Sequence, residues 1–408
     1  MPIYLETYGC TMNKADSEII KALLHNQITD NFDNADIVII NSCGVKGPTE
    51  HKIRKRIKEV QNLGKTLIVA GCLPKISELD TNVVGTNVYD LPEAVERVTQ
   101  GQKVNIIKEE KQNKLCYPRI GDNVKGIIPI SEGCLGACTY CAARIARGHL
   151  FSYPVESIIR TAQAFVAQGY RELQITSQDT GCYGLDTNER LPSLLEKLVQ
   201  IEGKFKIRVG MMNPNHVSDI LDDLLDVYHN EKIYQFLHIP VQSGNDEILE
   251  LMSRKYTVNQ FLEICQTFKK EFPNLCLWTD IIVGFPTETE DQFNDTLQLV
   301  KKIQPDKINV TRYSPRPNTK AAKMPQFPDR IKKERSRKLH KLRMYISLKI
   351  NNQYVGKPFE VLISEKGLVE STMIGRTFNY KPVICTGELG EFKKITIKSA
   401  KPTYLKAI

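Results

Sequence analysis

The chain has 408 residues, a formal net charge of +9 and 41% hydrophobic residues, which is enough apolar material for several packed domains. No apolar run is long enough to span a membrane, and the first residues resemble neither a signal nor a transit peptide, so we expect a cytoplasmic protein without a membrane partner. The eleven cysteines are odd in number and irregularly spaced, which is not typical of a secreted disulfide framework.

Residues 1–104 predict a parallel α/β sheet. The strands IYLETYGC, ADIVIINSC and TLIVAGC alternate with amphipathic helices, and each strand gives way to its loop at a cysteine: Cys10, Cys43 and Cys72. Because the carboxyl ends of parallel strands lie along one edge, the three thiols could meet there. The alternative is three small buried core residues. No GxGxxG pattern occurs, so a dinucleotide site is not expected, and the polar residues 105–125 predict a linker.

Residues 126–325 predict six strand–helix steps. Since a full eight-step barrel takes about 250 residues, six steps indicate a partial (βα)6 barrel with its site at the carboxyl ends of the strands. Polar side chains gather at those ends, although such residues can also simply cap helices. They are Ser177, Gln178, Asp179, Asn213, Gln242, Ser243, Glu288 and Arg312.

The last part of the chain is basic. Residues 326–343 predict a basic linker helix, and residues 344–408 predict a small all-β barrel of short strands. Two basic segments, Lys332 to Lys349 and Lys393 to Lys406, flank and build this barrel, with aromatic residues between the charges. The pattern favours RNA, held by phosphate contacts and base stacking, but it is also compatible with an ordinary solvated surface.

Three cysteines follow the first strand of the predicted barrel, in the stretch SEGCLGACTYCAARIARG. Cys134, Cys138 and Cys141 have no fourth cysteine or histidine at ligand spacing, so a closed structural zinc site would lack a ligand. A 4Fe–4S cube held by three thiolates instead keeps one iron open for a substrate or cofactor. The spacing therefore favours an iron–sulfur cluster at which chemistry takes place.

A CxxxCxxC pattern at this place in a βα barrel resembles the radical S-adenosylmethionine enzymes. The resemblance implies that the open iron is chelated by S-adenosylmethionine, whose reductive cleavage yields a 5′-deoxyadenosyl radical that abstracts hydrogen. It also implies that Tyr140, which precedes the last cysteine, lies beside the adenine. A chance occurrence of the spacing is the alternative.

The whole chain resembles the methylthiotransferases, through the strings ETYGCTMNKADSE, NSCGV, AGCLPK, HIPVQSGND, MSRKYT, TDIIVGFPTETEDQF and YSPRPNTKAAKM. The resemblance implies a second 4Fe–4S cluster on Cys10, Cys43 and Cys72 that carries the sulfur, and a terminal barrel of the TRAM type. One S-adenosylmethionine would supply the methyl group and another the radical. The implied cofactor contacts are Gln178, Asp179, Asn213, Gln242 and Arg254. Buried structural thiols are expected at Cys182, Cys265, Cys276 and Cys385, and Cys116 has no assigned role.

The strings GCLGACTYC and RVGMMNPNHV look most like the archaeal and eukaryotic branch of that family. This implies N6-threonylcarbamoyladenosine at tRNA position 37 as the substrate, together with an electron donor and a sulfur donor of unknown identity. The basic terminal part agrees with tRNA as partner. The alternatives are a methylthiotransferase for isopentenyladenosine or for a ribosomal-protein aspartate, and, in a different class, a non-catalytic iron–sulfur protein that binds RNA.

Overall fold

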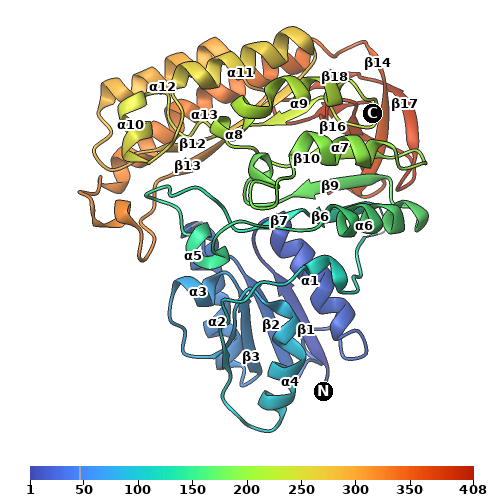
Figure 1. Cartoon of the computed structure of the whole chain (residues 1–408), viewed down its shortest axis with the longest axis vertical. Helices are drawn as coiled ribbons and strands as arrows, with labels where there is room; N and C mark the ends of the chain where they lie inside the picture. The colour runs from blue at the N-terminus through green and yellow to red at the C-terminus, as the bar shows by residue number, and fades with distance from the viewer. Residues whose placement is uncertain (46, 123) are drawn as a thin grey trace.

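The computed structural model describes residues 1–45, 47–122 and 124–408. Figure 1 shows the amino-terminal part, in blue, below a central part that runs from green to orange, with the red C-terminal strands packed against one side of the central part. Within the described residues, no helix has the length and apolar character needed to cross a membrane.

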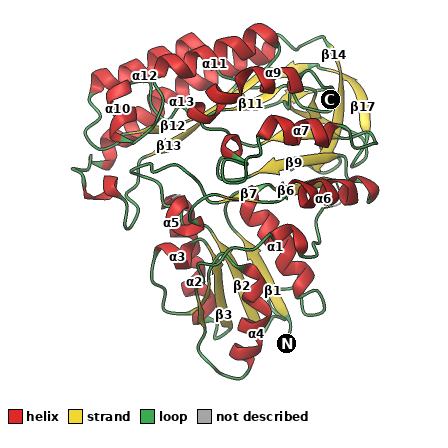
Figure 2. Cartoon of the chain, viewed as in Figure 1, coloured by secondary structure: helices red, strands yellow, loops and turns green. Residues whose placement is uncertain are grey.

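The amino-terminal part is a parallel sheet, as predicted, but it has five strands, in the order β1-β2-β3-β4-β5, where the sequence indicated three. Strand β2 is buried along its whole length because helices cover both faces, and a separate apolar cluster lies on each face (Figure 2). The strands are β1 (Ile3–Thr7), β2 (Ile37–Ser42), β3 (Thr66–Gly71), β4 (Asn82–Val84) and β5 (Asn105–Ile106), and the helices are α1 (Thr11–Leu23), α2 (Gly47–Asn62), α3 (Leu73–Ile76) and α4 (Leu91–Thr99).

The central part contains six parallel strands in two groups of three, in the orders β10-β9-β6 and β11-β12-β13. A single parallel bridge between Ile207 and Ile233 joins the groups, so the strands form the partial barrel that the sequence predicts. The strands are β6 (Lys125–Pro129), β9 (Glu172–Thr176), β10 (Lys206–Val209), β11 (Phe236–His238), β12 (Cys276–Val283) and β13 (Lys307–Arg312), with the short pair β7 (Ser131–Glu132) and β8 (Phe151–Ser152) after β6.

Helices cover the outer face of this barrel. Two of them begin with a capping box, in which Thr257 pairs with Gln260 and Thr289 with Gln292, and this fixes where each helix starts. The helices of the central part are α5 (Ala143–Arg147), which packs against the amino-terminal part instead, and α6 (Val155–Ala167), α7 (Leu191–Val199), α8 (Pro214–Val217), α9 (Leu221–Tyr228), α10 (Asp246–Leu251), α11 (Val258–Glu271) and α12 (Glu290–Ile303).

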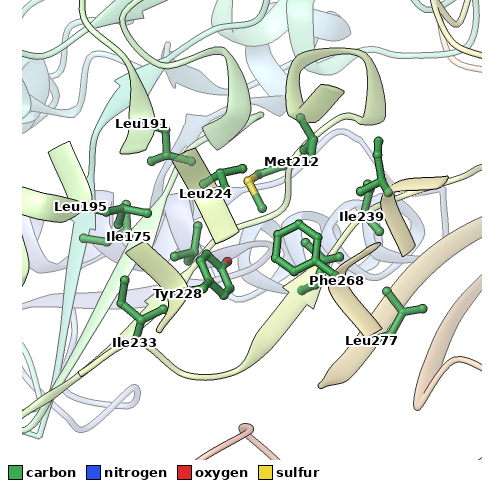
Figure 3. Close-up of a cluster of buried hydrophobic side chains, with 14 of the residues drawn as sticks. Ile175, Leu191, Leu195, Met212, Leu224, Tyr228, Ile233, Ile239, Phe268 and Leu277 are labelled. Carbon is green, nitrogen blue, oxygen red and sulfur yellow. The ribbon is translucent and has the colours of Figure 1, made fainter. Parts of the chain in front are cut away.

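One large apolar cluster lies between the strands and these helices (Figure 3). In it, the ring of Tyr228 meets the ring of Phe268 edge-on, with centroids 5.5 Å apart. The Tyr228 hydroxyl donates to the backbone carbonyl of Phe236 at 3.3 Å, so its polar end is satisfied inside the core. This packing holds the barrel strands in place and leaves their carboxyl ends free for a site.

A long helix, α13 (Asp329–Asn352), leads to the C-terminal strands. It runs beyond residue 343, where the sequence suggested that the linker helix would end. Its last turns are held by the neighbouring parts: Ser347 donates to the carbonyl of Asp306 at 2.7 Å, and Asn351 donates to the carbonyl of Lys401 at 2.8 Å.

The C-terminal part is a curled six-stranded sheet in the order β17-β14-β15-β16-β19-β18. Tyr380 of this part lies at the amino ends of β9 and β11, with its ring 4.9 Å from that of Tyr234 and 5.1 Å from that of Phe236. The small barrel is therefore packed onto the larger one through buried aromatic rings. Its strands are β14 (Pro358–Lys366), β15 (Met373–Thr377), β16 (Pro382–Cys385), β17 (Phe392–Thr396), β18 (Ser399–Ala400) and β19 (Leu405–Lys406).

Candidate active site

Cys134, Cys138 and Cys141 lie in the loop between β7 and α5 and line a cavity of about 510 Å³. Each sulfur accepts a hydrogen bond. The donors are the backbone N–H of Gly136 to Cys134 at 3.2 Å, the backbone N–H of Ala143 to Cys141 at 3.4 Å, and the Arg254 guanidinium to Cys138 at 3.1 Å. Donors aimed at sulfur stabilise the thiolate form that binds metal.

Gly133 explains how the chain enters this loop. Its φ of +85° lies in the left-handed region, and a Cβ there would approach the carbonyl oxygen of His149 to 1.9 Å. Only glycine is compatible with this position. The close approach also brings the backbone N–H of Gly133 to the side-chain carbonyl of Gln178, at 2.6 Å, so the turn connects the cysteine loop to the end of β9.

The three thiols fit a cluster with one open iron. Burial raises the pKa of Cys134 to about 12 and also raises the pKa of Cys141, so positive metal charge is needed to deprotonate them at neutral pH. No fourth cysteine of the described chain lines the cavity, and the single histidine that does, His149, accepts from the Arg144 guanidinium at 2.9 Å. Three thiolates and an adjoining hollow match a cube with one iron left for a ligand.

Five of the side chains expected to contact the cofactor line the same cavity: Tyr140, Gln178, Asn213, Gln242 and Arg254. They come from the cysteine loop, from the loops after β9, β10 and β11, and from the turn after α10. Arg254 donates to the side-chain oxygen of Asn213 as well as to the Cys138 sulfur, so it connects the cysteine loop to the end of β10.

Asp179 lies beneath the cavity and is fully buried. Its carboxylate accepts from the side chain of Asn213 at 2.6 Å, from the backbone of Asn213 at 3.0 Å and from His216 Nδ1 at 2.8 Å. Although burial opposes ionisation, the hydrogen bonds from His216 and Asn213 keep the pKa of Asp179 below its usual value. The geometry makes Asp179 a residue that orients Asn213 toward the cavity.

Asp179, Cys182 and His216 are also the only three metal-binding side chains of the described chain whose ligand atoms all lie within 4.8 Å of each other. Hydrogen bonds already account for this proximity, because His216 Nδ1 lies 2.8 Å from the Asp179 carboxylate and the Cys182 thiol donates to the backbone carbonyl of Asp179 at 3.1 Å. Outside the segment 134–149, four further residues that line the cavity were not predicted from the sequence. Three of these follow one another in the string YSPRPNTKAAKM, which was noticed but not assigned to the site. The four are Met211, Asn318, Thr319 and Lys320.

The second cysteine triple lies at the carboxyl edge of the amino-terminal sheet, as predicted. Cys10 precedes α1, Cys43 follows β2 and Cys72 follows β3. Burial raises the pKa of Cys72 to about 11; the charge of Arg147 opposes this rise, and the charges of Cys10 and Cys43 add to it. The three thiols are thus close enough to act on one another. Gly9, with φ of +123°, allows the approach, because a Cβ there would lie 2.7 Å from the Cβ of Cys43.

Helix α5 separates the two triples. It starts two residues after Cys141, and its buried Ala146 packs, together with the N-cap residue Ala142, against Cys72 and Ile76 of the amino-terminal part. At its last residue, the Arg147 guanidinium donates to the carboxylate of Glu132 at 2.6 Å and to that of Asp16 at 2.7 Å. One short helix therefore contacts both candidate cluster sites.

Lys114 of the linker completes this arrangement. Its ammonium lies 2.9 Å from the Asp16 carboxylate and 3.1 Å from the Glu132 carboxylate, and it donates to the carbonyl of Thr86 at 2.8 Å. Two cations thus balance two carboxylates in a site that is almost completely buried. The network joins the sheet, the linker and the barrel, and sequence reasoning did not identify any of its four members.

A second cavity, of about 620 Å³, lies where the three parts of the chain meet. The amino-terminal part contributes the residues on either side of Cys10, the barrel contributes side chains of β6, β9, β10 and β12, and the C-terminal part contributes residues of β14 and β15 and Tyr380. The cavity thus extends from the edge of the second cysteine triple into the barrel.

Three family models match the chain in order: "Uncharacterized protein family UPF0004" at residues 2–88, "Radical SAM superfamily" at residues 128–300, and "TRAM domain" at residues 352–408. The probable threonylcarbamoyladenosine tRNA methylthiotransferase of Pyrococcus horikoshii is 48% identical over 99% of this chain and 98% of its own length. The chain belongs to this methylthiotransferase family. The human threonylcarbamoyladenosine tRNA methylthiotransferase is 34% identical over 94% of this chain and 69% of its own length.

Solved structures show the same fold at low sequence identity. The radical S-adenosylmethionine methyltransferase TsrM of Kitasatospora setae matches with a TM-score of 0.58 at 13% identity, covering 79% of this chain and 75% of its own. The cobalamin-dependent S-adenosylmethionine radical enzyme OxsB matches with a TM-score of 0.51, also at 13% identity, covering 85% of this chain and 56% of its own.

These findings confirm several predictions: the methylthiotransferase family, the radical S-adenosylmethionine enzyme class, the sheet, partial barrel and TRAM architecture, and two 4Fe–4S clusters with S-adenosylmethionine as cofactors. Transfer RNA as partner also agrees with the family. The roles of individual side chains, the electron donor and the sulfur donor stay predictions.

Proposed function

We propose that this enzyme converts N6-threonylcarbamoyladenosine at position 37 of tRNA to its 2-methylthio derivative. The observation that carries the proposal is the placement of two thiol triples on either side of α5, because methylthio transfer needs one centre that makes the radical and another that delivers sulfur. The names of the full-length relatives support the choice of substrate. Such an enzyme would work in the cytoplasm, where thiols stay reduced and tRNA is available.

When bound, the two clusters and S-adenosylmethionine supply the radical that removes hydrogen from C2 of the adenine and the methylthio group that replaces it. The chain holds the reactants in place. Arg254 keeps a positive charge against the Cys138 sulfur and fixes Asn213, while Asp179 holds Asn213 from below. Gln178 and Gln242 present polar groups to the cavity from the loops after β9 and β11. Orientation of this kind is the main contribution that a protein makes to cofactor chemistry.

The test uses cells that lack this protein, complemented with single variants of the full chain. Mass spectrometry of tRNA nucleosides should show 2-methylthio-N6-threonylcarbamoyladenosine with the wild type and none with Cys134→Ala or Cys10→Ala. Cys116→Ala is the matched control, because Cys116 is exposed and outside both triples, and it should restore the product fully. Loss of the isopentenyl analogue, or of a ribosomal-protein modification with tRNA unchanged, would contradict the proposed substrate.

The two triples can be told apart in purified, anaerobically reconstituted protein. Cys134→Ala should abolish cleavage of S-adenosylmethionine, whereas Cys10→Ala should retain 5′-deoxyadenosine formation and lose methylthio transfer. Methylthiolated product from the Cys10→Ala variant at the wild-type level would exclude a sulfur-delivering role for the amino-terminal triple.

A further inference from the structure

The second cavity contains an arginine without an acidic partner. Arg208 lies in β10 and lines the cavity. It forms no ion pair within 4.0 Å with any carboxylate of the described chain, and its buried Nε has no hydrogen-bond partner. Its guanidinium carbon instead lies 5.2 Å from the ring centre of Phe236 and 5.5 Å from that of Tyr380. A half-buried cation among rings is costly unless an anion joins it.

The nearby acidic groups lie next to other cations or donors: in the cavity wall, Glu18 is 3.9 Å from Arg119 and Asp122 is 3.8 Å from Lys125. Glu172 at the start of β9 is fully buried, and its carboxylate accepts from the Gln174 side chain at 2.6 Å and from the Tyr380 hydroxyl at 3.2 Å. Glu365 lies 2.7 Å from the guanidinium of Arg376, the other arginine in the cavity. Arg376 therefore has an acidic partner, and Arg208 is the arginine of the cavity without one, whereas Lys14 and Lys21 lie exposed at the rim.

The cavity suits a nucleoside in size and lining. It has a volume of about 620 Å³, and Trp278, the single tryptophan of the chain, forms part of its wall with Tyr380. Ligand pockets of several hundred cubic ångströms with aromatic walls and a few polar groups are typical of small organic molecules. Gly9 and Thr11, on either side of Cys10, bring the second cysteine triple to the edge of the same cavity.

We propose that this cavity holds the modified adenosine and that Arg208 binds the carboxylate of its N6 side chain. This inference rests on the proposed function and adds how the enzyme selects threonylcarbamoyladenosine as its substrate. A threonylcarbamoyl group carries a free carboxylate, whereas an isopentenyl group is an uncharged hydrocarbon. A guanidinium matches a carboxylate with two parallel hydrogen bonds, and a site built for such bonds rejects a ligand that cannot make them. Arg208 is thus the residue by which this enzyme distinguishes its substrate from the isopentenyl one.

The experiment compares the binding of two RNAs to the reconstituted full chain. Both are anticodon stem-loops with N6-threonylcarbamoyladenosine, one with the free carboxylate and one with its methyl ester. Because charge-assisted bonds are strong, the wild type should bind the acid about ten- to a hundredfold more tightly. Arg208→Gln should bind both RNAs with equal affinity, and Arg208→Lys should keep part of the preference. Equal binding of the two RNAs by the wild type would overturn the inference, and so would full preference in Arg208→Gln.

Two controls test whether the loss of preference is specific to Arg208 and whether the variant is folded. Lys14→Gln removes an exposed cation at the rim of the same cavity and should weaken both RNAs equally. Far-ultraviolet circular dichroism and iron content should be the same in Arg208→Gln as in the wild type, which shows that the variant is folded and carries its clusters. If the wild type modifies its tRNA while Arg208→Gln still discriminates, this inference alone fails; if the wild type modifies no threonylcarbamoyladenosine, the proposed function fails.

Discussion

The guanidinium of Arg147 lies 2.7 Å from the carboxylate of Asp16, although the two residues are 131 positions apart in the chain. Asp16 belongs to α1 of the amino-terminal part and Arg147 to α5 of the barrel. Both are buried, and Arg147 also acts electrostatically on Cys72 and Cys10. The ion pair therefore joins the amino-terminal part to the barrel next to the second cysteine triple.

Arg147→Met should lower the free energy of unfolding by about 3–5 kcal/mol, because it leaves the buried carboxylates of Asp16 and Glu132 with only Lys114 as a cation. Urea denaturation followed by circular dichroism measures the loss. Arg97→Met is the control, since the pair of Arg97 with Glu93 is exposed and should contribute less than about 0.5 kcal/mol. Equal stability of the two variants would show that the network does not hold the halves together.

Asp179→Asn should weaken the binding of S-adenosylmethionine by roughly tenfold, because an amide has one acceptor oxygen in place of two and can no longer accept from both the side chain and the backbone N–H of Asn213. Equilibrium dialysis against reconstituted protein measures the affinity. The iron content should equal that of the wild type, since Asp179 does not touch the cysteines of the cluster loop. Wild-type affinity in this variant would mean that Asn213 does not depend on Asp179 for its position.

Glu18 predicts a pH dependence of stability. Burial raises the pKa of this carboxyl to about 7, so between its ordinary pKa near 4.5 and pH 7 the folded state binds more protons than the unfolded state. Stability contributed by this group is thus present at low pH and is lost as pH rises through 7. Glu18→Gln has no carboxyl to ionise, so its free energy of unfolding should exceed that of the wild type by up to roughly 3 kcal/mol at pH 8. At pH 4.5 the two proteins should differ little in stability. Urea midpoints at the two pH values test the sign, and a variant whose advantage shrinks with rising pH would refute it.

Lys14 and Lys21 should contribute to the salt dependence of tRNA binding. Both are exposed at the rim of the second cavity, on the same side of α1 as Glu18. If each contacts a phosphate, the double change to Gln should reduce the slope of log affinity against log salt by about 2. Lys338→Gln is the control, because its ammonium is already held by Glu290 at 2.9 Å and Glu334 at 3.2 Å. A slope equal to that of the wild type would place the tRNA backbone elsewhere.

The sequence could predict the parallel strands before Cys10, Cys43 and Cys72, the six strands of the barrel and the burial of Cys182, Cys265, Cys276 and Cys385, all of which the structure bears out. The reason is that apolar periodicity can be seen within a short stretch of sequence, and that the carboxyl ends of parallel strands always lie along one edge of the sheet. The short strands β4 and β5 were not predicted, and the cluster-binding roles of the two cysteine triples stay predictions. The buried network of Asp16, Lys114, Glu132 and Arg147 could not be predicted from the sequence, because each of these residues gains its partners only when segments that are distant in the chain pack together. Arg208 could not be predicted either, because nothing in the sequence of its short strand distinguishes it from an ordinary charged residue and only the structure shows the cavity around it.

The basic helix illustrates a different limit. Its composition suggested an RNA-binding surface, but Lys332 and Arg335 are buried, and Arg335 forms ion pairs with Glu288 at 2.7 Å and Glu290 at 3.4 Å. Arg335 therefore attaches the helix to the barrel, whereas Lys332 pairs with Asp329 of the same helix at 3.4 Å. Composition counts charges without telling which of them have internal partners. The exposed cations of the same helix, Lys333, Arg337 and Lys341, form no ion pair with any described residue and stay candidates for tRNA contact.

The ring of Tyr380 packed between the two barrels affects how the terminal part can be studied. A truncated chain ending after α13 would expose Tyr234 and Phe236 to water and would deprive Glu172 of a hydrogen-bond donor. Such a chain would lose catalytic competence through damage to the larger barrel, even if the missing strands never touched RNA. Point changes on the outer strands, with Tyr380 left intact, are the informative way to ask what the small barrel recognises.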